Sequence, residues 1–487
     1  MHLQDFIAEL HCPCCGSGFQ EEIQFSTENS NGLYGIIRCA CYRYPIIEGI
    51  LVLKQVSGSA DTRDRAIECI EAGDLDGALY YALSPNSAAP RARKTHLQEM
   101  IDFLGCESSS FGRKLTHREQ KHTVGKICNG SLSFRQAVSV LRPTAYADYL
   151  YHRYANNSFL ASIAPLLLLN ELHCEQYGSS KSSGERIEAC RSNYETSGVS
   201  TTGSRRHPPR VLDFACGVGH ASFLIASLFP ELSVIAADHD FANLYLARRY
   251  LIPNVACLCI DAEIPLPFED KSFDAVFCLD GLHYIRSKVA LLSELDRVLQ
   301  REGLWLFPHL HNAMAHNVSP GIPLALDDYQ RCFEFLHHQI LPEADVLRDF
   351  IIDQSLDLSA SPSSTELRQE NVFSLIGSRR RDLWRKHSNM AALLWRAKPA
   401  LSINPIYRVT NPGKTLQLKM EWPNAGLEEE CAVIKKYLPQ EYTIDSSLWK
   451  SSTNGMMNRE DEAAIQSLIN SFVLVHLPRH YSDLVIQ

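Results

Sequence analysis

The chain has 487 residues, enough for two to four domains, and 45% of them are hydrophobic, which is an ordinary globular composition. Lys and Arg number 47 and Asp and Glu number 56, and the resulting net charge of −9 disfavours a general binder of nucleic acid. The chain starts without a basic segment followed by an apolar run, and its longest apolar stretch, residues 159–169, is too short to span a bilayer, so we expect a cytoplasmic protein whose 16 cysteines are reduced or bind metal.

Two cysteine pairs mark residues 1–56, which we predict to be a small β module. Cys12 and Cys15 form a C-x-x-C on a turn, and Cys39 and Cys41 form a C-x-C after a short strand. Two pairs separated by roughly twenty residues are typical of a zinc ribbon, in which four thiolates surround one Zn²⁺. Cys14 is a further candidate ligand. The alternative is a metal-free module with small buried cysteines.

The end of this module, RYPIIEGILVL at residues 43–53, resembles the closing strand of a family of small zinc-ribbon-like proteins that activate certain methyltransferases. The resemblance implies a zinc-ribbon-like fold, a zinc ion held by the four paired cysteines and a protein partner for the module. The sequence departs from the family at its second pair, where the family has C-x-x-C, and some relatives have lost the metal.

Residues 57–176 are predicted to be helical, and residues 177–209 form a linker rich in Ser, Gly and Thr. Helices are expected at 62–83, with a break at Gly73-Asp74, and at 95–103, 134–141 and 146–172. The last is the strongest candidate, and Pro165 should kink it because proline lacks the N–H that a helix interior needs.

The central stretch of the chain is RVLDFACGVGH at residues 210–220, at the start of a predicted core at 210–320. Apolar residues run into Asp213, a turn of small residues follows, and an apolar helix begins at Ala221. Gly217 and Gly219 carry no Cβ, so the backbone can approach a ligand closely, and the helix N-terminus aims its N–H groups at that ligand.

Further apolar strands follow this turn, and three of them end at an acidic residue. SVIAAD ends at Asp238, VACLCI is followed by Asp261, and SFDAVFCLD ends at Asp280. Asp238 lies about 25 residues after Asp213, near the spacing at which an acid meets a ribose in doubly wound folds. A helix and another strand complete the pattern at LLSELDRVLQREGLWLF.

Five strands in this order, with these acids, resemble the core of class I S-adenosylmethionine (SAM)-dependent methyltransferases of the type 11 kind, over residues 206–311. The resemblance implies a Rossmann-like α/β fold with a mostly parallel seven-stranded sheet and SAM as cofactor. Ala215 replaces the first glycine of the family motif, and His220 stands near the last. The implied cofactor-binding residues are Asp213, Ala215, Gly217, Gly219, Asp238, His239, Asp261, Ala262 and Asp280.

In this family, residues after the fourth and fifth strands border the acceptor pocket, and helices before the first strand cover the cofactor. The candidate catalytic residues are therefore His283, Tyr284, His309 and His311, with His316 nearby. Histidine exchanges a proton near neutral pH, although a structural, hydrogen-bonded histidine is the alternative for each. The candidates for a lid, against a simple packed face, are Tyr149, His152, Arg153 and Tyr154.

Residues 321–487 are expected to complete the sheet and to cover the substrate. The last two strands of the sheet come either from a hairpin at 403–422, with its Asn-Pro-Gly turn, or from NVFSLIGSR at 371–379, and the sequence does not decide between them. No motif in this extension names the substrate.

The predicted function is methyl transfer from SAM to a small or medium-sized acceptor, at O, N or C. Two alternatives remain open. A ribosomal-RNA base methyltransferase fits the module order, because some such enzymes carry an N-terminal zinc module, but the net charge and the lack of a basic stripe disfavour it. A non-catalytic SAM-binding scaffold fits the imperfect first motif.

Overall fold

The computed structural model describes residues 3–26, 33–54, 60–83, 132–142, 144–176, 208–315, 321–395, 401–410, 414–449, 459–478 and 480–482. The helix expected at 95–103, almost all of the linker expected at 177–209, and His316 lie outside these described residues. Among the described helices, none has the length and apolarity needed to cross a membrane.

A single eleven-stranded sheet forms the centre of the molecule. In spatial order its strands are β1 (Gln20–Ser26), β2 (Leu33–Arg38), β3 (Arg43–Ile47), β4 (Ile50–Val52), β7 (Ala256–Cys259), β6 (Ser233–Asp238), β5 (Arg210–Phe214), β8 (Phe273–Phe277), β9 (Leu299–His311), β12 (Val372–Gly377) and β10 (His338–Pro342). The run from β4 through β7, β6, β5 and β8 to β9 is parallel throughout. The seven strands from β7 to β10 therefore confirm the expected mostly parallel sheet.

The last two strands of this sheet come from the first part of the C-terminal extension. Strand β12 pairs antiparallel with β9 on one side and with β10 on the other. Because β12 lies within NVFSLIGSR, the structure decides the choice that the sequence left open. The expected hairpin does form, but as β15 (Tyr407–Thr410) and β16 (Thr415–Met420) of a separate sheet that β17 (Glu441–Asp445) completes.

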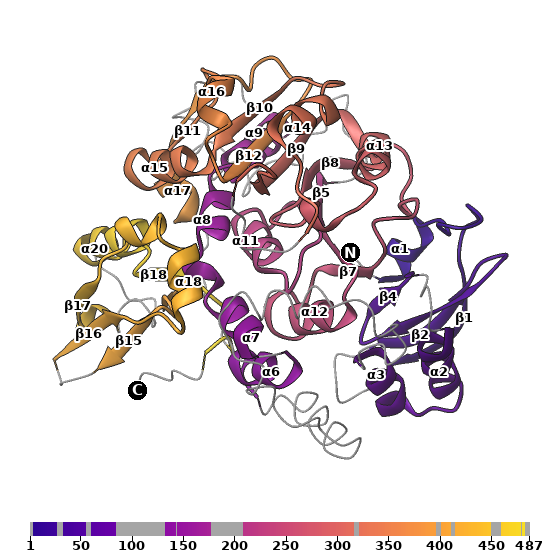
Figure 1. Cartoon of the computed structure of the whole chain (residues 1–487). Helices are drawn as coiled ribbons and strands as arrows, with labels where there is room; N and C mark the ends of the chain where they lie inside the picture. The colour runs from indigo at the N-terminus through magenta and orange to yellow at the C-terminus, as the bar shows by residue number, and fades with distance from the viewer. Residues whose placement is uncertain are drawn as a thin grey trace, which may run out of the picture.

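The N-terminal module joins the core sheet through its last strand. Leu51 of β4 stands opposite Leu258 of β7, and both side chains are fully buried. RYPIIEGILVL is thus a hairpin of β3 and β4 rather than a single closing strand. Glu48 and Gly49 form its turn with φ values of 53° and 71°, which is the left-handed backbone that two-residue hairpin turns need. Figure 1 shows these indigo strands and the yellow C-terminal region on opposite sides of the core.

Helices cover both faces of the sheet. Those in and after the core are α11 (His220–Leu228), α12 (Phe241–Leu246) with its π-helical end η4 (Ala247–Leu251), η5 (Leu282–Tyr284), α13 (Lys288–Val298), α14 (Leu326–Cys332), α15 (Glu343–Asp353), α16 (Ser364–Leu367), α17 (Met390–Leu394), α18 (Ala425–Glu430), η7 (Ile434–Lys436) and α20 (Arg459–Asn470). Those before the core are α1 (Leu3–Ala8), α2 (Ala60–Glu71), α3 (Leu75–Leu83), α6 (Phe134–Leu141), α7 (Thr144–Tyr151), η2 (Arg153–Ala155), α8 (Asn157–Ile163) and α9 (Leu166–Gln176). Two short antiparallel pairs, β11 (Leu356–Asp357) with β13 (Lys386–His387) and β14 (Leu401–Ile403) with β18 (Leu474–His476), complete the described elements.

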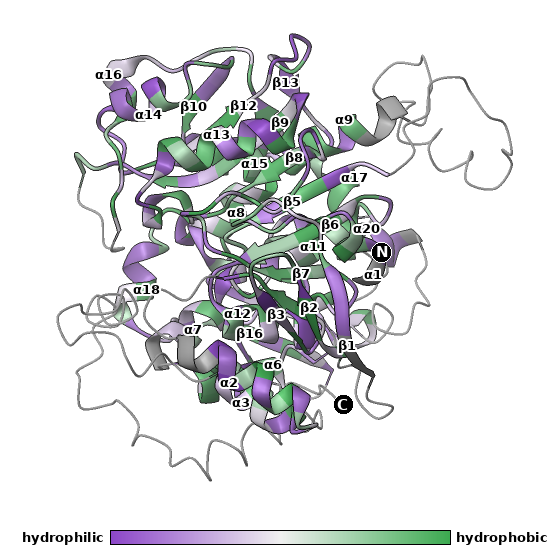
Figure 2. Ribbon diagram, turned by 90° about the vertical axis from the view of Figure 1, so that its right-hand side faces the viewer, coloured by the Kyte–Doolittle hydropathy of each residue, from purple (hydrophilic) through white to green (hydrophobic). Residues whose placement is uncertain are grey.

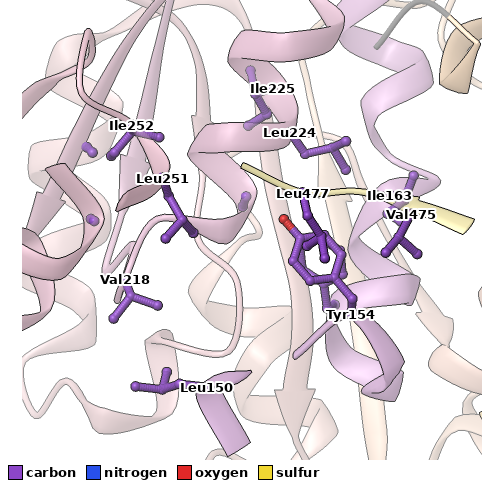
Figure 3. Packing of buried hydrophobic residues seen from close by; sticks show 14 of the residues in the cluster. Leu150, Tyr154, Ile163, Val218, Leu224, Ile225, Leu251, Ile252, Val475 and Leu477 are labelled. Carbon is purple, nitrogen blue, oxygen red and sulfur yellow. The ribbon is translucent and has the colours of Figure 1, made fainter. Parts of the chain in front are cut away.

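The alternation of side chains along the central strands divides the core into two clusters, one on each face of the sheet. In β5, Val211 belongs to the larger cluster and Leu212 to the smaller one. The central strands are hydrophobic along most of their length, as expected for parallel strands buried on both faces (Figure 2). Figure 3 shows the larger cluster gathering side chains from η2, such as Tyr154, from α11, such as Leu224, and from β18, such as Val475.

The single long helix expected at 146–172 is wrong, because the chain there forms four shorter pieces: α7, η2, α8 and α9. Asn156 adopts an extended backbone with φ −84° and ψ 140°, and its side chain accepts a hydrogen bond from the N–H of Ser158. Asparagine is among the best N-cap residues, so the chain restarts there as a new helix. Pro165 stands at the second break, where proline cannot donate the next helical hydrogen bond.

Candidate active site

A cavity of about 570 Å³ opens at the carboxyl ends of the central strands, where ligands of open α/β sheets bind. The turn after β5, the end of β6, the loop after β8 and the end of β9 form its floor. Residues of α7, η2, α8 and α15 form its walls, together with residues 369–372 and with residues 429–433 of the C-terminal extension. Elements far apart in the sequence therefore enclose one space.

The glycine turn after β5 is held against β6 by hydrogen bonds. The N–H of Gly217 donates to Oδ2 of Asp238 over 2.8 Å, and the N–H of Cys216 donates to the carbonyl of Ala237 over 3.1 Å. Gly217 has φ 56° and Ala215 has φ 57°, a left-handed backbone that is costly for alanine. The alanine that replaces the first glycine of the motif therefore keeps the glycine-like backbone of this turn.

Gly219 is closely packed, and its predicted contact with the cofactor stays a prediction. It has φ 81° and caps α11, and it does not line the cavity. A Cβ added there would lie 3.0 Å from Cδ1 of Ile252 and 3.2 Å from Cβ of Ala247. The sequence assigned both glycines to the cofactor, whereas the structure shows Gly219 at the contact between the start of α11 and η4.

Asp213 and Asp238 both line the cavity. Asp213 is fully buried, its carboxylate accepts a hydrogen bond from the hydroxyl of Ser222, and burial raises its pKa to about 7. Asp238 accepts backbone N–H bonds on both oxygens, from Gly217 and from Asp240, each over 2.8 Å. Its carboxylate is thus fixed at the end of β6 by the turn that it faces.

Besides Gly219, three further predicted cofactor residues do not line the cavity. They follow β6 and β7, and they are His239, Asp261 and Ala262. The side chain of His239 is 72% exposed, and Asp261 accepts a hydrogen bond from the N–H of Glu263 over 3.0 Å. Their predicted contacts with the cofactor stay predictions.

Asp280 is the polar centre of the cavity. Its Oδ2 accepts a hydrogen bond from the hydroxyl of Tyr149 over 2.8 Å and pairs with Arg153 over 3.3 Å. Its Oδ1 faces Nε2 of His311 at 3.4 Å and Nε2 of His309 at 3.8 Å. Burial alone would raise the pKa of Asp280, but the charges of His309 and Arg153 and the hydrogen bond from His311 hold it well below its usual range.

Two of the four lid candidates reach this centre. The guanidinium of Arg153 stacks 4.8 Å above the ring of Tyr149, so these two side chains support each other against Asp280. His152 and Tyr154 are buried and do not line the cavity, so a packed role describes them better.

His309 and His311 lie at the end of β9, where the pairing with β12 shifts register between Phe373 and Leu375. Such a bulge re-aims side chains, and His309 has a left-handed φ of 62°. Nδ1 of His309 lies 2.6 Å from Oε2 of the buried Glu343. Burial lowers the pKa of His309, but the charges of Glu343 and Asp280 outweigh it and raise this pKa to about 9.

His283, one of the four candidate catalytic residues, is fully buried and does not line the cavity. Its ring centroid lies 4.3 Å from that of His311 and 3.8 Å from that of Tyr284, so it packs behind these two cavity-lining residues. The loop at Gly321 and Ile322 also packs against His283. This arrangement therefore gives no support to a direct contact between His283 and an acceptor.

Sequence reasoning missed the contributions of Glu343 and Glu430. Glu343 begins α15, and Glu430 ends α18 and accepts a hydrogen bond from the side chain of Asn156 over 2.8 Å. Neither residue stands in a recognisable motif, since Glu430 is one of three consecutive glutamates and Glu343 reads as an ordinary first-turn acid. Only the folding of the extension over α8 brings them to the cavity.

The cavity is strongly acidic. The chain lines it with carboxylates from Asp213, Asp238, Asp280, Glu343, Glu370, Glu429 and Glu430, whereas Arg153 is the single lysine or arginine among its described lining residues. Such a wall favours cationic ligands and disfavours a pyrophosphate at the glycine turn.

A second cluster of functional side chains lies in the N-terminal module. The Sγ atoms of Cys12, Cys15, Cys39 and Cys41 all lie within 4.8 Å of one another, with 3.6 Å from Cys12 to Cys41 and 3.4 Å from Cys39 to Cys41. A tetrahedral zinc site with Zn–S bonds of about 2.3 Å places its sulfurs roughly 3.8 Å apart, so the four thiols fit the ion despite the C-x-C spacing. Cys14 is not part of this group.

The sheet order, the glycine turn after the first core strand and the cavity above it are those of the class I methyltransferase fold, which the sequence resemblance implied. Residues 211–303 match the family model described as a methyltransferase domain. The cysteine cluster is compatible with the resemblance of the N-terminal module.

The curated relatives of this domain are methyltransferases. The chain is 32% identical over 104 residues to malonyl-(acyl-carrier protein) O-methyltransferase of Legionella pneumophila, covering 21% of this chain and 37% of that protein. It is 38% identical over 103 residues to phthiotriol/phenolphthiotriol dimycocerosates methyltransferase 1 of Mycobacterium ulcerans, covering 21% and 37%. It is 28% identical over 167 residues to the ubiquinone/menaquinone biosynthesis C-methyltransferase of Pasteurella multocida, covering 30% and 62%.

The chain thus spans little more than a third of the length of the first two relatives. Among solved structures, it is 18% identical, with a TM-score of 0.27, to the complex between the Haloferax volcanii Trm112 methyltransferase activator and the putative methyltransferase, covering 36% of this chain and 84% of that chain. A TM-score this low carries no argument about the activity.

Proposed function

We propose that this chain is a SAM-dependent methyltransferase that acts on a small or medium-sized acceptor. The observation that carries the proposal is the acidic cavity above the glycine turn, because SAM brings a sulfonium and an ammonium to a site where seven carboxyl groups face one arginine and the protonated His309. The fixed carboxylate of Asp238 suits the ribose diol, since its oxygens still have lone pairs for two hydroxyl donors.

In this proposal the acceptor atom attacks the methyl carbon in line with the sulfonium. The new bond forms as the carbon–sulfur bond breaks, and its electron pair stays on sulfur in S-adenosylhomocysteine. Such catalysis is mostly the positioning of two bound reactants. Tyr284, His309 and His311 line the cavity where this proposal places the acceptor. A proton released by the acceptor would pass to His311 or to water, because the raised pKa of His309 leaves that histidine protonated at neutral pH.

The N-terminal module belongs to the same proposal. We assign one zinc ion to Cys12, Cys15, Cys39 and Cys41, where the spacing of the four thiols supports it. A cytoplasmic location suits such closely spaced thiols, because a reducing compartment keeps them available to metal. A protein partner for this module, which the resemblance implies, stays a prediction, as does the absence of nucleic acid from the cavity.

The test is calorimetric titration of the full chain with SAM and with S-adenosylhomocysteine, followed by transfer from methyl-labelled SAM into a mixture of small metabolites and, separately, into ribosomal RNA. We expect micromolar affinity, roughly −8 kcal/mol, and label in the small-molecule fraction. Label in RNA would favour the alternative substrate class. SAM binding without transfer in either mixture would favour a scaffold, and no binding at millimolar ligand would overturn the proposal.

A further inference from the structure

We propose that Asp280, His309 and His311 form a binding site for one divalent transition-metal ion on the acceptor side of the cavity. One oxygen of Asp280 and one ring nitrogen from each histidine all lie within 4.8 Å of one another, and all three residues line the cavity. Two histidines and one carboxylate on one side of an ion form the facial arrangement that proteins use for ions such as Fe²⁺ and Mn²⁺, and it leaves positions open for a ligand.

The three donors lie close together, slightly farther apart than a bound ion would hold them. Metal bonds of about 2.0–2.2 Å place neighbouring ligand atoms of a facial arrangement roughly 2.8–3.1 Å apart. Oδ1 of Asp280 lies 3.4 Å from Nε2 of His311 and 3.8 Å from Nε2 of His309. Binding of the ion therefore requires the two histidine nitrogens to move closer to Oδ1 of Asp280 by less than about 1 Å.

The surroundings hold two of the three donors, Asp280 and His309, in position. Tyr149 and Arg153 both contact Oδ2 of Asp280, and this fixes the carboxylate with Oδ1 directed at the two histidines. Glu343 contacts Nδ1 of His309 over 2.6 Å, which leaves Nε2 as the nitrogen that faces Asp280. A carboxylate on the far nitrogen of a metal-binding histidine is the usual partner of such ligands.

The backbone at two of the three positions is strained. Asp280 has φ 56° and His309 has φ 62°, in the left-handed region that side-chain-bearing residues rarely adopt. Strain of this kind persists where the surrounding structure fixes it, and it concentrates at functional sites. The two backbone positions aim donors from different strand ends, β8 and β9, into one space.

The open positions of the ion would face the cavity and take an oxygen atom of the methyl acceptor, so the acceptor class is one that carries a hydroxyl, carboxylate or phosphate oxygen. This assignment of the ligand rests on the proposed methyltransferase function, whereas the metal site itself does not. The competing arrangement is a metal-free ion cluster in which a proton on His309 joins Asp280 and Glu343.

The experiment is a titration of the full chain with Mn²⁺, in which the electron paramagnetic resonance signal of free Mn²⁺ measures how much of the ion remains unbound. Mn²⁺ is chosen because it prefers oxygen and imidazole donors and avoids the thiolate cluster of the N-terminal module. We expect one bound Mn²⁺ per chain, a weakening of at least about 100-fold in His311→Ala, and a weakening of about 10–100-fold in Glu343→Gln.

The matched control is Cys14→Ser, at an exposed thiol outside both groups of candidate ligands, and it should bind Mn²⁺ like the parent chain. Unfolding temperature and SAM affinity are measured for every variant, so a folding defect is recognised, and Glu343→Gln decides if His311→Ala does not fold. No Mn²⁺ uptake by the parent chain at millimolar ion, or unchanged uptake in the folded variants, would overturn the site.

Adding a chelator to the transfer assay separates the two proposals. Mn²⁺ uptake that depends on His311 without any methyl transfer keeps the metal site and removes its link to the proposed function. Methyl transfer by a chain that takes up no Mn²⁺ and resists chelators keeps the function and removes the metal site.

Discussion

Nδ1 of His309 lies 2.6 Å from Oε2 of Glu343, and both side chains are buried. The pair joins the bulged end of β9 to the first residue of α15, and it sits next to Asp280, whose Oδ1 lies 3.8 Å from the other nitrogen of His309. Burying an unpaired carboxylate is costly, so Glu343 needs the contact with His309. The same contact orients the ring of His309 toward the cavity.

Replacing Asp238 with alanine should weaken SAM binding about 10–100-fold. The loss follows from two charged hydrogen bonds to the ribose, which contribute about 1.5–3 kcal/mol each, partly offset by water. It should also loosen the glycine turn, because Asp238 holds the N–H of Gly217. Calorimetry with S-adenosylhomocysteine measures the change. Asp353→Ala, an exposed acid near Lys386, is the control, and equal affinity in the two folded variants would make Asp238 purely structural.

The chain should contain one zinc ion, and Cys41→Ser should release it. The four clustered thiols supply the ligands, and three are too few for a closed structural site. Elemental analysis of the purified chain gives the stoichiometry. Cys14→Ser is the matched control and should keep the metal, because Cys14 stands outside the cluster. A parent chain without zinc, with its thiols titrating freely, would place the module in the metal-free class.

Leu51→Ala should destabilise the chain by about 2–5 kcal/mol, in a single unfolding transition that the module shares with the core. Leu51 is fully buried on β4, and β4 continues the core sheet through β7. Urea unfolding followed by tryptophan fluorescence and circular dichroism measures the shift. Val289→Ala, at a side chain on the surface, should change little. An early, separate transition of the module would show that the shared sheet is not one cooperative unit.

His152 should make the fold sensitive to acid. Burial lowers its pKa from 6.5 to about 4, although the hydrogen bond to the carbonyl of Asp148 opposes the shift. The unfolded chain therefore binds more protons than the native chain. The free energy of unfolding falls as the pH drops from about 6.5 towards 4, by about 2 kcal/mol at pH 5. His152→Asn keeps a donor for the carbonyl of Asp148 and removes the imidazole that titrates. Urea midpoints at pH 7 and pH 5 test it, and identical acid sensitivity in the two chains would count against it.

The sequence predicts those parts of the site that depend on residues close together in the chain. The sequence predicts the glycine turn and Asp238 because the signal is local: a strand, a turn and a helix start follow one another within a few residues, and hydrophobic patterning fixes the register. Asp280, His309 and His311 were found one by one, since each follows a strand. Nothing in the sequence states that Oδ1 of Asp280 faces both histidines, because that depends on how β8 and β9 end beside each other.

The predictions for His283 and for the helix at 146–172 differ from the structure because of effects that the strand pattern does not contain. His283 follows β8 just as the family pattern requires, but the turn of η5 carries its ring behind His311. The helix expected at 146–172 breaks because a local cap at Asn156 competes with helical hydrogen bonding, an effect that hydrophobic periodicity does not reveal.

The sequence by itself determined the class of the domain, the order of its core strands and the two groups of cysteines, because short-range patterning and turn chemistry specify these features. Tertiary structure alone decided which strands close the sheet, that β4 joins the module to β7, and that Glu343 and Glu430 reach the cavity. These depend on contacts between residues far apart in the chain, which form only when burial of the two sheet faces brings the segments together, and no local pattern encodes them.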